Sequence, residues 1–136
     1  MNKILITGGA GYLGSVLVPL LLERGYQVTV LDNFMYGVPS LSASCRYKEL
    51  TVVNGDVQDY KQVKDLVQGT MAVVPLAAIV GAPACEQNKD KAIDINLSAV
   101  NGLLAVCNDQ IVVFPNTNSG YGITASGAFC TEETPL

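Results

Sequence analysis

The sequence contains no histidine and no tryptophan, and only 15% of its 136 residues are charged. Without histidine, a Ser-His-Asp triad is excluded, and a zinc site would lack its usual imidazole ligands. The cysteines form no C-x-x-C pair, so we interpret them as reduced thiols of a cytoplasmic protein. They stand far apart at Cys45, Cys85, Cys107 and Cys130. Any acid–base chemistry must therefore use other groups.

Basic clusters and long apolar runs are also missing. The formal net charge is −4, so we expect neither nucleic acid nor an anionic membrane surface as a partner. No apolar run reaches the roughly 20 residues that span a bilayer, and the N-terminus lacks the features of a signal peptide. With 49% hydrophobic residues, the chain can bury one core, and we expect a single domain over residues 1–136.

Glycines are abundant, and three of them follow the first apolar segment at regular spacing. The segment Lys3–Gly14 reads K-I-L-I-T-G-G-A-G-Y-L-G. Residues 4–7 are typical of a buried strand, and residues 15–22 form an apolar run of helix length. A strand, a glycine turn and a helix in this order direct free N–H groups and the positive end of the helix dipole at a bound phosphate.

Each glycine has a predicted role in this turn. We expect Gly8 to make the tight turn, Gly11 to let a pyrophosphate approach the backbone, and Gly14 to let the helix pack close to the strand. A second strand over residues 26–31 ends at Asp32, eighteen positions after Gly14, where an acidic residue would hold a ribose diol. The alternative is a strand-helix-strand unit that binds no nucleotide.

Strand and helix patterns alternate along the rest of the chain. Strands are predicted over residues 50–54, 71–78 and 111–114, helices over 59–67 and 90–108, and loops over 33–44, 79–87 and 116–136. We expect Asp59 to cap its helix and Pro75 to end its strand. The long helix should bury one stripe, formed by Ile93, Leu97, Val100, Leu103, Leu104 and Cys107.

The alternation predicts an α/β fold, a Rossmann-type doubly wound parallel sheet. That fold usually has six strands in the order 3-2-1-4-5-6, and five are recognisable here. A missing last strand would leave a hydrophobic face bare. We therefore interpret the chain as the N-terminal piece of a longer protein, with the C-terminal part of the sheet missing.

Five separate motifs together resemble one family. They are T-G-x-x-G-x-x-G at residues 7–14, the acidic residue Asp32, L-A-A at 76–78, D-I-N-L at 94–97 and P-N-T-N-S-G-Y-G at 115–122. The chain is similar to the extended short-chain dehydrogenase/reductases, which include the NAD-dependent sugar-nucleotide epimerases and dehydratases. Val80 departs from the pattern, because sugar-nucleotide epimerases often carry lysine there to contact the nicotinamide ribose.

The resemblance implies NAD as cofactor and a set of residues that bind it. The charge of Asp32 would repel a 2′-phosphate, which favours NAD over NADP. Asp56 would contact the adenine, or else act as a helix cap or turn residue. Asn96, and less clearly Asn101, would order the active-site helix. The full cofactor-binding set is Gly8, Gly11, Tyr12, Leu13, Asp32, Asn33, Asp56, Val57, Leu76, Ala77, Ala78 and Asn96.

The same resemblance places Thr117 at the position of the catalytic serine, with Ser119 as the second choice. Tyr121 matches a non-catalytic tyrosine, because Ala125 stands where a lysine would be needed. The family's acid–base pair, Tyr-x-x-x-Lys, would follow the T-E-x-x-P segment at residues 131–135. We interpret the chain as lacking it. In that mechanism the lysine lowers the pKa of the tyrosine, which takes the proton of a sugar hydroxyl while hydride moves to NAD.

We therefore predict an oxidoreductase or epimerase that acts on a nucleotide-linked sugar, and a homodimer in the full-length form. A dinucleotide-binding module without catalysis is the alternative, because of the missing tyrosine and lysine. An S-adenosylmethionine-binding domain is less compatible with a glycine turn suited to phosphate.

Overall fold

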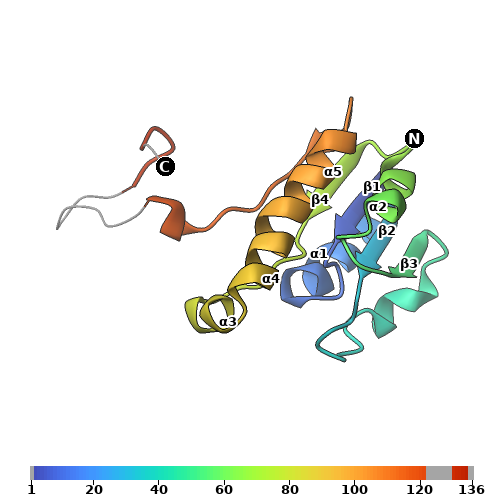
Figure 1. Ribbon diagram of the computed structural model, residues 1–136. Coiled ribbons are helices and arrows are strands. Elements are labelled where there is room, and N and C mark those ends of the chain that lie inside the picture. The colour runs from blue at the N-terminus through green and yellow to red at the C-terminus, as the bar shows by residue number, and fades with distance from the viewer. Residues whose placement is uncertain (1, 122–129, 135–136) are drawn as a thin grey trace.

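The computed structural model describes residues 2–121 and 130–134. Its centre is a five-stranded sheet with the strand order β3-β2-β1-β4-β5 and parallel pairing throughout (Figure 1). The strands are β1 (Lys3–Thr7), β2 (Gln27–Asp32), β3 (Leu50–Asn54), β4 (Ala72–Pro75) and β5 (Ile111–Val112). This order confirms the predicted Rossmann-type doubly wound fold.

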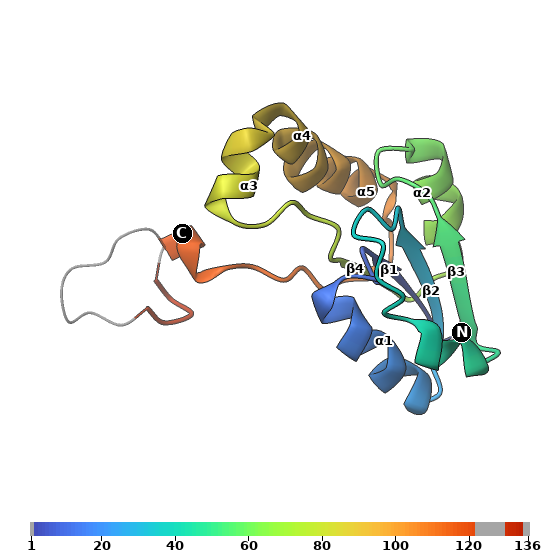
Figure 2. The ribbon, with the colours of Figure 1, turned by 90° about the horizontal axis from the view of Figure 1, so that it is seen from below.

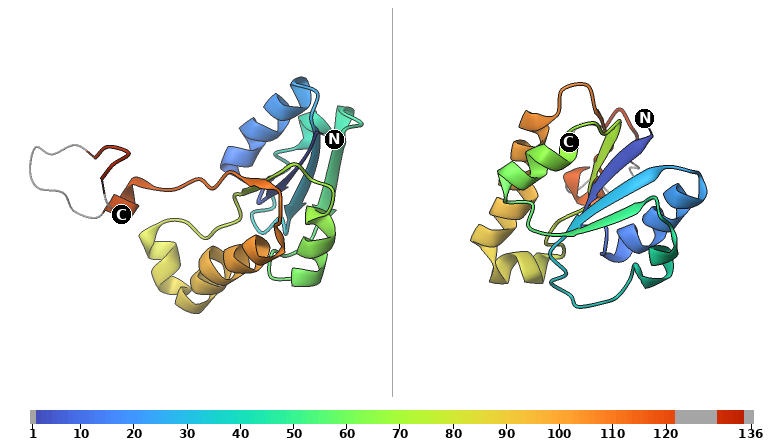
Figure 3. Two further views of the ribbon diagram at one scale, coloured as in Figure 1. Left: turned by 90° about the horizontal axis from the view of Figure 1, so that it is seen from above. Right: turned by 90° about the vertical axis from the view of Figure 1, so that its right-hand side faces the viewer.

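Helices cover both faces of the sheet. Helix α1 (Tyr12–Glu23) lies on one face, while α2 (Tyr60–Val67) and the helices between β4 and β5 lie on the other (Figures 2 and 3). This arrangement follows from right-handed crossovers between parallel strands, which place connecting helices on both faces. The three layers leave the carboxyl ends of the strands open at one edge.

Strand β1 is buried on both faces. Ile4 and Ile6 pack against α1, whereas Leu5 packs against α2 and the helix before β5. Side chains alternate between the two faces of a strand, so the continuous apolar run of β1 supplies two cores at once. Thr7, at its end, is also buried. The glycine turn that follows is therefore anchored on a rigid strand.

Two predictions about where a helix begins and a strand ends are confirmed. The carboxylate of Asp59 caps α2 by accepting a hydrogen bond from the N–H of Gln62 at 3.0 Å. Strand β4 ends at Pro75, which has no N–H to continue the ladder. The predicted loop over residues 33–44 ends in a short 3₁₀ helix, η1 (Ser42–Arg46).

The prediction of a loop over residues 79–87 is wrong in its second half. Helix α3 (Ala82–Gln87) begins there, after Gly81 with a φ of 92°. Pro83 lies in the first turn of α3, where a helix does not need the missing N–H and the fixed φ of proline suits the helix. The proline that suggested a loop therefore starts a helix.

The long helix exists, but its predicted buried stripe is partly wrong. It consists of α4 (Lys89–Ile93), a π-helical segment η2 (Asp94–Ala99) and α5 (Val100–Val106). The buried side chains are Ala92, Ile95, Ala99 and Leu103. Ile93, Leu97 and Leu104 are 54%, 56% and 43% exposed instead. The buried positions recur at ordinary helical spacing, and two of the four are small alanines, whereas the large aliphatic residues lie mostly on the exposed side.

The chain beyond β5 runs away from the sheet (Figures 1 and 2). Strand β5 is shorter than the predicted 111–114, and Phe114 is exposed. A short 3₁₀ turn, η3 (Asn118–Tyr121), follows. None of the helices in the described part of the chain is long and apolar enough to cross a membrane.

Candidate functional site

Three hydrogen bonds bring the carboxyl ends of the central strands into one row. The N–H of Gly8 donates to the carbonyl of Leu31 at 2.8 Å, and the N–H of Leu76 donates to the carbonyl of Thr7 at 2.8 Å. The N–H of Gly55 donates to the carbonyl of Asp32 at 3.0 Å. The four chain segments that leave β1, β2, β3 and β4 therefore start side by side.

A cleft of about 680 Å³ opens above this row. It is lined by the glycine turn, the start of α1, the loop after β2, the turn after β3 and residues 76–80. All the predicted cofactor-binding residues line it except Asn96. Open α/β sheets bind ligands at this edge, where the strand order reverses, and β1 lies at that reversal here.

Gly8 allows the closest backbone approach in the cleft. Its φ is 70°, a conformation that residues with a side chain rarely adopt. A Cβ atom at this position would overlap the backbone of Ala77. Gly14 is equally restricted, because a Cβ there would overlap the backbone of Gly9. At Gly14, helix α1 thus lies in close contact with the glycine turn, while Val18 and Leu22 further along the helix pack against β1.

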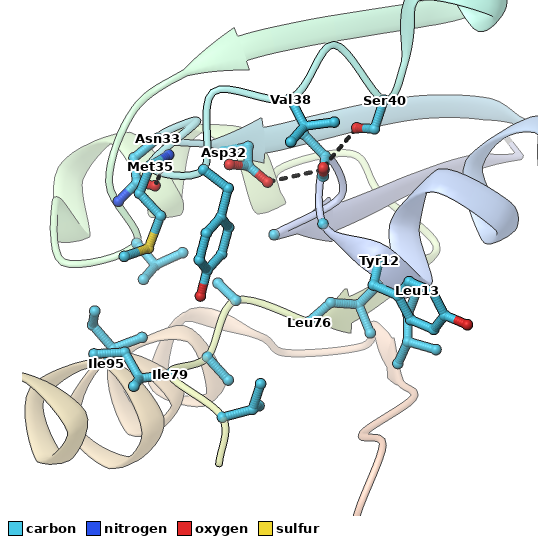
Figure 4. Close-up of a pocket in the computed structure, with 18 of the residues that line it drawn as sticks. Tyr12, Leu13, Asp32, Asn33, Met35, Val38, Ser40, Leu76, Ile79 and Ile95 are labelled. Atoms are coloured by element: carbon cyan, nitrogen blue, oxygen red, sulfur yellow. Dashed lines mark hydrogen bonds between the residues drawn. The ribbon is translucent and has the colours of Figure 1, made fainter. Parts of the chain in front are cut away.

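The start of α1 presents uncapped N–H groups to the cleft. The first N–H groups of a helix have no partner within the helix, and the residue before α1, Gly11, has no side chain to cap them. Tyr12 and Leu13 line the cleft, and Figure 4 shows them at the start of α1. These N–H groups and the helix dipole together favour an anion.

Asp32 lies at the end of β2 and connects two parts of the site. Its Oδ2 accepts a hydrogen bond from the N–H of Ala10 at 2.9 Å, and its Oδ1 accepts one from the N–H of Phe34 at 2.8 Å. Each carboxylate oxygen can accept a further bond, so ribose hydroxyls remain acceptable partners. The negative charge disfavours a phosphate on the same ribose.

Asp56 lies in the turn after β3 and lines the cleft beside Val57. Its Oδ1 accepts a hydrogen bond from the N–H of Gln58 at 3.0 Å, which is the bond of an Asx turn. The residue that caps α2 is Asp59, so the alternative role of Asp56 as a helix cap is wrong. Asp56 therefore shapes the turn and faces the cleft at the same time.

The opposite wall consists of residues 76–80, where the small Ala77 and Ala78 leave room against the backbone. Val80 is 73% exposed and lines the same wall. Sequence reasoning missed several lining residues in the loop after β2, among them Met35, Tyr36 and Ser40. Apolar side chains in an exposed loop carry no periodic signal that would have identified them.

Asn96 does not line the cleft, but it hydrogen-bonds to Ile79, which does. Its Oδ1 accepts a hydrogen bond from the N–H of Ile79, and its Nδ2 donates to the carbonyl of the same residue, both at 2.8 Å. Asn96 belongs to the π-helical segment η2, and Ile79 is buried. The asparagine thus attaches the chain after β4 to the long helix.

The predicted catalytic segment does not reach the cleft. Thr117 is exposed and is not among the lining residues. Tyr121 lies at the end of η3, and the side chain of Ser119 lies outside the described residues, as does Ala125. The structure therefore gathers the predicted cofactor-binding residues and leaves the predicted catalytic residue apart.

A Tyr-x-x-x-Lys spacing does occur in the chain, at Tyr60–Lys64 in α2, although sequence reasoning took the motif to be absent. The hydroxyl of Tyr60 donates to the carbonyl of Ser98 at 3.4 Å, and its ring packs where a Cβ on Gly102 would lie. Neither Tyr60 nor Lys64 lines the cleft. Tyr60 instead makes a packing contact between α2 and the long helix.

Other reactive groups contribute nothing to the cleft. Within residues 2–121 and 130–134, no group of three or more histidine, cysteine, aspartate or glutamate side chains could hold a metal ion. Burial raises the pKa of the Cys107 thiol, so less of it is the reactive thiolate at neutral pH. The four cysteines are free.

Comparison with known proteins agrees with this geometry. The model of the NAD dependent epimerase/dehydratase family matches residues 4–136. The UDP-N-acetyl-alpha-D-glucosaminuronate decarboxylase of Bacillus cytotoxicus is 32% identical over 127 residues, which cover 89% of this chain and 38% of that protein. The 3-beta-hydroxysteroid dehydrogenase of Mycolicibacterium neoaurum is 30% identical over 76% of this chain and 28% of its own length.

The fold also matches solved structures. The crystal structure of a dTDP-glucose 4,6-dehydratase from Streptomyces venezuelae with NAD bound superposes with a TM-score of 0.87 at 29% identity. That match covers 98% of this chain and 45% of the other. The chain thus spans less than half the length of each of these relatives.

Proposed function

The chain belongs to the NAD dependent epimerase/dehydratase family, and we propose that it binds NAD in the cleft at the carboxyl edge of the sheet. The observation that carries this proposal is the placement of Asp32 beside the glycine turn, with its Oδ2 2.9 Å from the N of Ala10. A carboxylate and an uncapped helix start in one cleft suit a ribose joined to a pyrophosphate.

The fit of NAD rests on three features of the cleft. The N–H groups at the start of α1 would hold the pyrophosphate, Asp32 would hold the adenosine ribose, and Asp56 would face the adenine. The close approach of Gly8 to the backbone of Ala77 keeps the turn free of a side chain at that point. When bound, NAD supplies the hydride acceptor.

We propose that the full-length protein oxidises an alcohol carbon of a nucleotide-linked sugar as its first step. Two of the relatives named above carry UDP or dTDP sugars in their names. The steroid dehydrogenase among them makes a hydroxysteroid the alternative substrate. A nucleotide-linked sugar is favoured because two of these three relatives have one in their names, against one that names a hydroxysteroid.

The residues that move the proton are assigned by resemblance. Thr117 would hydrogen-bond the reacting hydroxyl, and a Tyr-x-x-x-Lys pair in a C-terminal portion would accept its proton. The 136 residues would then form the cofactor half of the enzyme. Support comes from the share of the relatives that the chain covers, between 28% and 45%.

A dinucleotide-binding module without catalysis is the second candidate. The observation that favours it is the position of Thr117, which is exposed and away from the cleft. Supplying the full-length protein with NAD and a UDP- or dTDP-linked hexose, and following absorbance of the reduced nicotinamide, separates the two. Reduction of NAD supports the enzyme; NAD binding without reduction, and without conversion of any sugar tested, supports the module.

Cofactor choice gives the sharpest test of the proposed site. Calorimetric titration of the 136-residue chain should show tighter binding of NAD than of NADP. In Asp32→Ala, the ratio of the two dissociation constants should fall by about tenfold, because the repulsion of the 2′-phosphate and the ribose contact are both lost. Asp65→Ala, an exposed carboxylate on α2, is the matched control. A wild-type chain that prefers NADP would exclude the proposed role of Asp32.

We also propose a cytoplasmic homodimer for the full-length protein. Four free cysteines are compatible with a reducing compartment, and the exposed Ile93, Leu97 and Leu104 of the long helix offer an apolar surface of the kind that dimers bury. Analytical ultracentrifugation of full-length protein and its Leu97→Glu variant tests the dimer. A dimer that survives this charge unchanged does not use the helix.

A further inference from the structure

The loop between β2 and η1 is fastened to the glycine turn by a single serine. The hydroxyl of Ser40 donates to the carbonyl of Ala10 at 2.6 Å, and thirty residues separate the two in sequence. Both residues are partly buried and both line the cleft. Figure 4 shows this bond beside the bond that Asp32 makes.

These bonds fix the peptide units on both sides of Ala10. Its N–H donates to Asp32, and its carbonyl accepts from Ser40. The Ala10–Gly11 peptide unit is also held at its other end, because the N–H of Gly11 donates to the carbonyl of Gly8 at 3.0 Å. A peptide unit is planar, so fixing both its groups sets its orientation.

That orientation determines where the next N–H groups point. The Ala10–Gly11 unit directly precedes Tyr12 and Leu13, whose N–H groups start α1 without a partner inside the helix. The hydroxyl of Ser40 bonds to the carbonyl of Ala10, which is not one of these N–H groups. Its influence on a bound phosphate would therefore pass through the backbone.

The loop itself has few other contacts that could hold it in place. Met35, Tyr36 and Val38 are exposed, and Phe34 adopts a φ of 52°, which is unfavourable for a residue with a large side chain. The bond from the N–H of Phe34 to Asp32 holds the start of the loop. Ser40 holds its end, next to the buried Leu41.

We propose that Ser40 is a positioning residue for the pyrophosphate: through the carbonyl of Ala10, it orients the N–H groups of Tyr12 and Leu13 without touching the cofactor. The inference rests on the proposed binding of NAD. It assigns a specific task to the loop after β2, which would control the phosphate-binding turn in addition to enclosing the adenosine.

The test compares ligands with and without the pyrophosphate. Affinities of NAD, ADP and adenosine are measured by NMR titration of the ¹⁵N-labelled chain, for the wild type and Ser40→Ala. We expect Ser40→Ala to lower the affinity for ADP and for NAD about fivefold, the equivalent of one hydrogen bond. Its affinity for adenosine should fall less than about twofold. Ser42→Ala, an exposed serine two positions on, should change none of the three.

A second pair of variants removes the dependence on one substitution. Ser40→Thr keeps the hydroxyl. Valine has the shape of threonine but no hydroxyl, so Ser40→Val and Ser40→Thr should affect packing in the same way. We expect Thr to bind ADP like the wild type and Val to bind it like Ser40→Ala. Thermal unfolding of all variants by circular dichroism shows whether each remains folded at the temperature of the titration.

Each other outcome overturns a defined statement. Equal losses for adenosine and ADP would mean that Ser40 contacts the ribose directly, and unchanged affinities with a lower melting temperature would mean a purely structural role. Either result excludes the positioning role while NAD binding stands. A wild-type chain that binds neither NAD nor ADP would instead exclude the proposed function.

Discussion

The two halves of the sheet edge differ in how their functional groups are held. On the side of β1 and β2, the glycine turn, Asp32 and Ser40 are joined by hydrogen bonds of 2.6 to 3.0 Å. On the side of β5, the chain leaves the sheet after two residues of strand, and Phe114 and Thr117 are exposed. The functional groups of the first half are thus bonded to one another at the cleft, whereas Thr117 of the second half does not line the cleft.

The difference shows that cofactor binding and catalysis depend on different parts of the molecule. Side chains that are held by hydrogen bonds within this part of the chain keep their geometry without contacts from other parts of the protein. Thr117 does not line the cleft, so its place in a working site would require the segment that carries it to come closer to the cleft. Substitutions on the two sides should therefore have very different effects in this chain.

The largest effect is expected at Gly8. Gly8→Ala would place a methyl group into the backbone of Ala77 and impose a φ of 70° on alanine, so we expect a loss of about 3 kcal/mol or more in the free energy of unfolding, and loss of NAD binding. Urea unfolding followed by circular dichroism measures the first quantity.

Gly69 offers a matched control for this substitution. Its φ is 71°, and a Cβ there would meet no atom within 4 Å. Gly69→Ala should thus carry only the conformational cost, about 1 kcal/mol. If the two variants were equally destabilised, the close approach of Gly8 to Ala77 would have no energetic importance.

A smaller effect is expected at Asn96, which attaches the chain after β4 to the long helix. Asn96→Ala would leave the N–H of the buried Ile79 without its partner and its carbonyl with only the weak thiol donor of Cys85, at a cost of about 2 kcal/mol. NAD affinity should fall by less than about fivefold, because Asn96 does not line the cleft. Denaturant unfolding and calorimetry provide the two values.

Asn101 lies on the same helix, is exposed, and serves as the control. Asn101→Ala should be neutral or stabilising by a few tenths of a kcal/mol, about the difference in helix propensity. Should Asn96→Ala leave stability unchanged, the two bonds to Ile79 would not attach the chain after β4.

The smallest effect is expected at Thr117. Because it is exposed and away from the cleft, Thr117→Ala should change the free energy of unfolding by less than about 0.5 kcal/mol and NAD affinity by less than about twofold. In the full-length protein, the same change should reduce turnover if Thr117 binds the reacting hydroxyl. A marked loss of NAD affinity in the 136-residue chain would remove the distinction between the two halves.

The cofactor half was predictable because local physics determines it. The glycine spacing, the apolar strands and Asp32 each follow from short-range requirements on backbone conformation and hydrogen bonding. The five-stranded order followed from the alternation of strands and helices. The cap at Asp59 and the strand end at Pro75 were readable for the same reason.

The errors occur where packing between distant segments decides. The long helix buries Ala92 and Ala99 and exposes Ile93, Leu97 and Leu104, so the position of its large aliphatic residues indicated the wrong face. Helix α3 has a proline, Pro83, in its first turn, and a proline equally suits a loop. Ser40 was invisible in the sequence because its partner, Ala10, is thirty residues away.

The backbone contact between Gly8 and Ala77 also limits how the cleft can be redesigned. At this point the cleft is bounded by main-chain atoms of the glycine turn and of the segment after β4, so a change of side chain elsewhere does not move this boundary. The loop of residues 33–40 has exposed side chains and few fixed contacts. Libraries that aim at cofactor analogues of altered size should therefore vary this loop and keep the glycine turn constant.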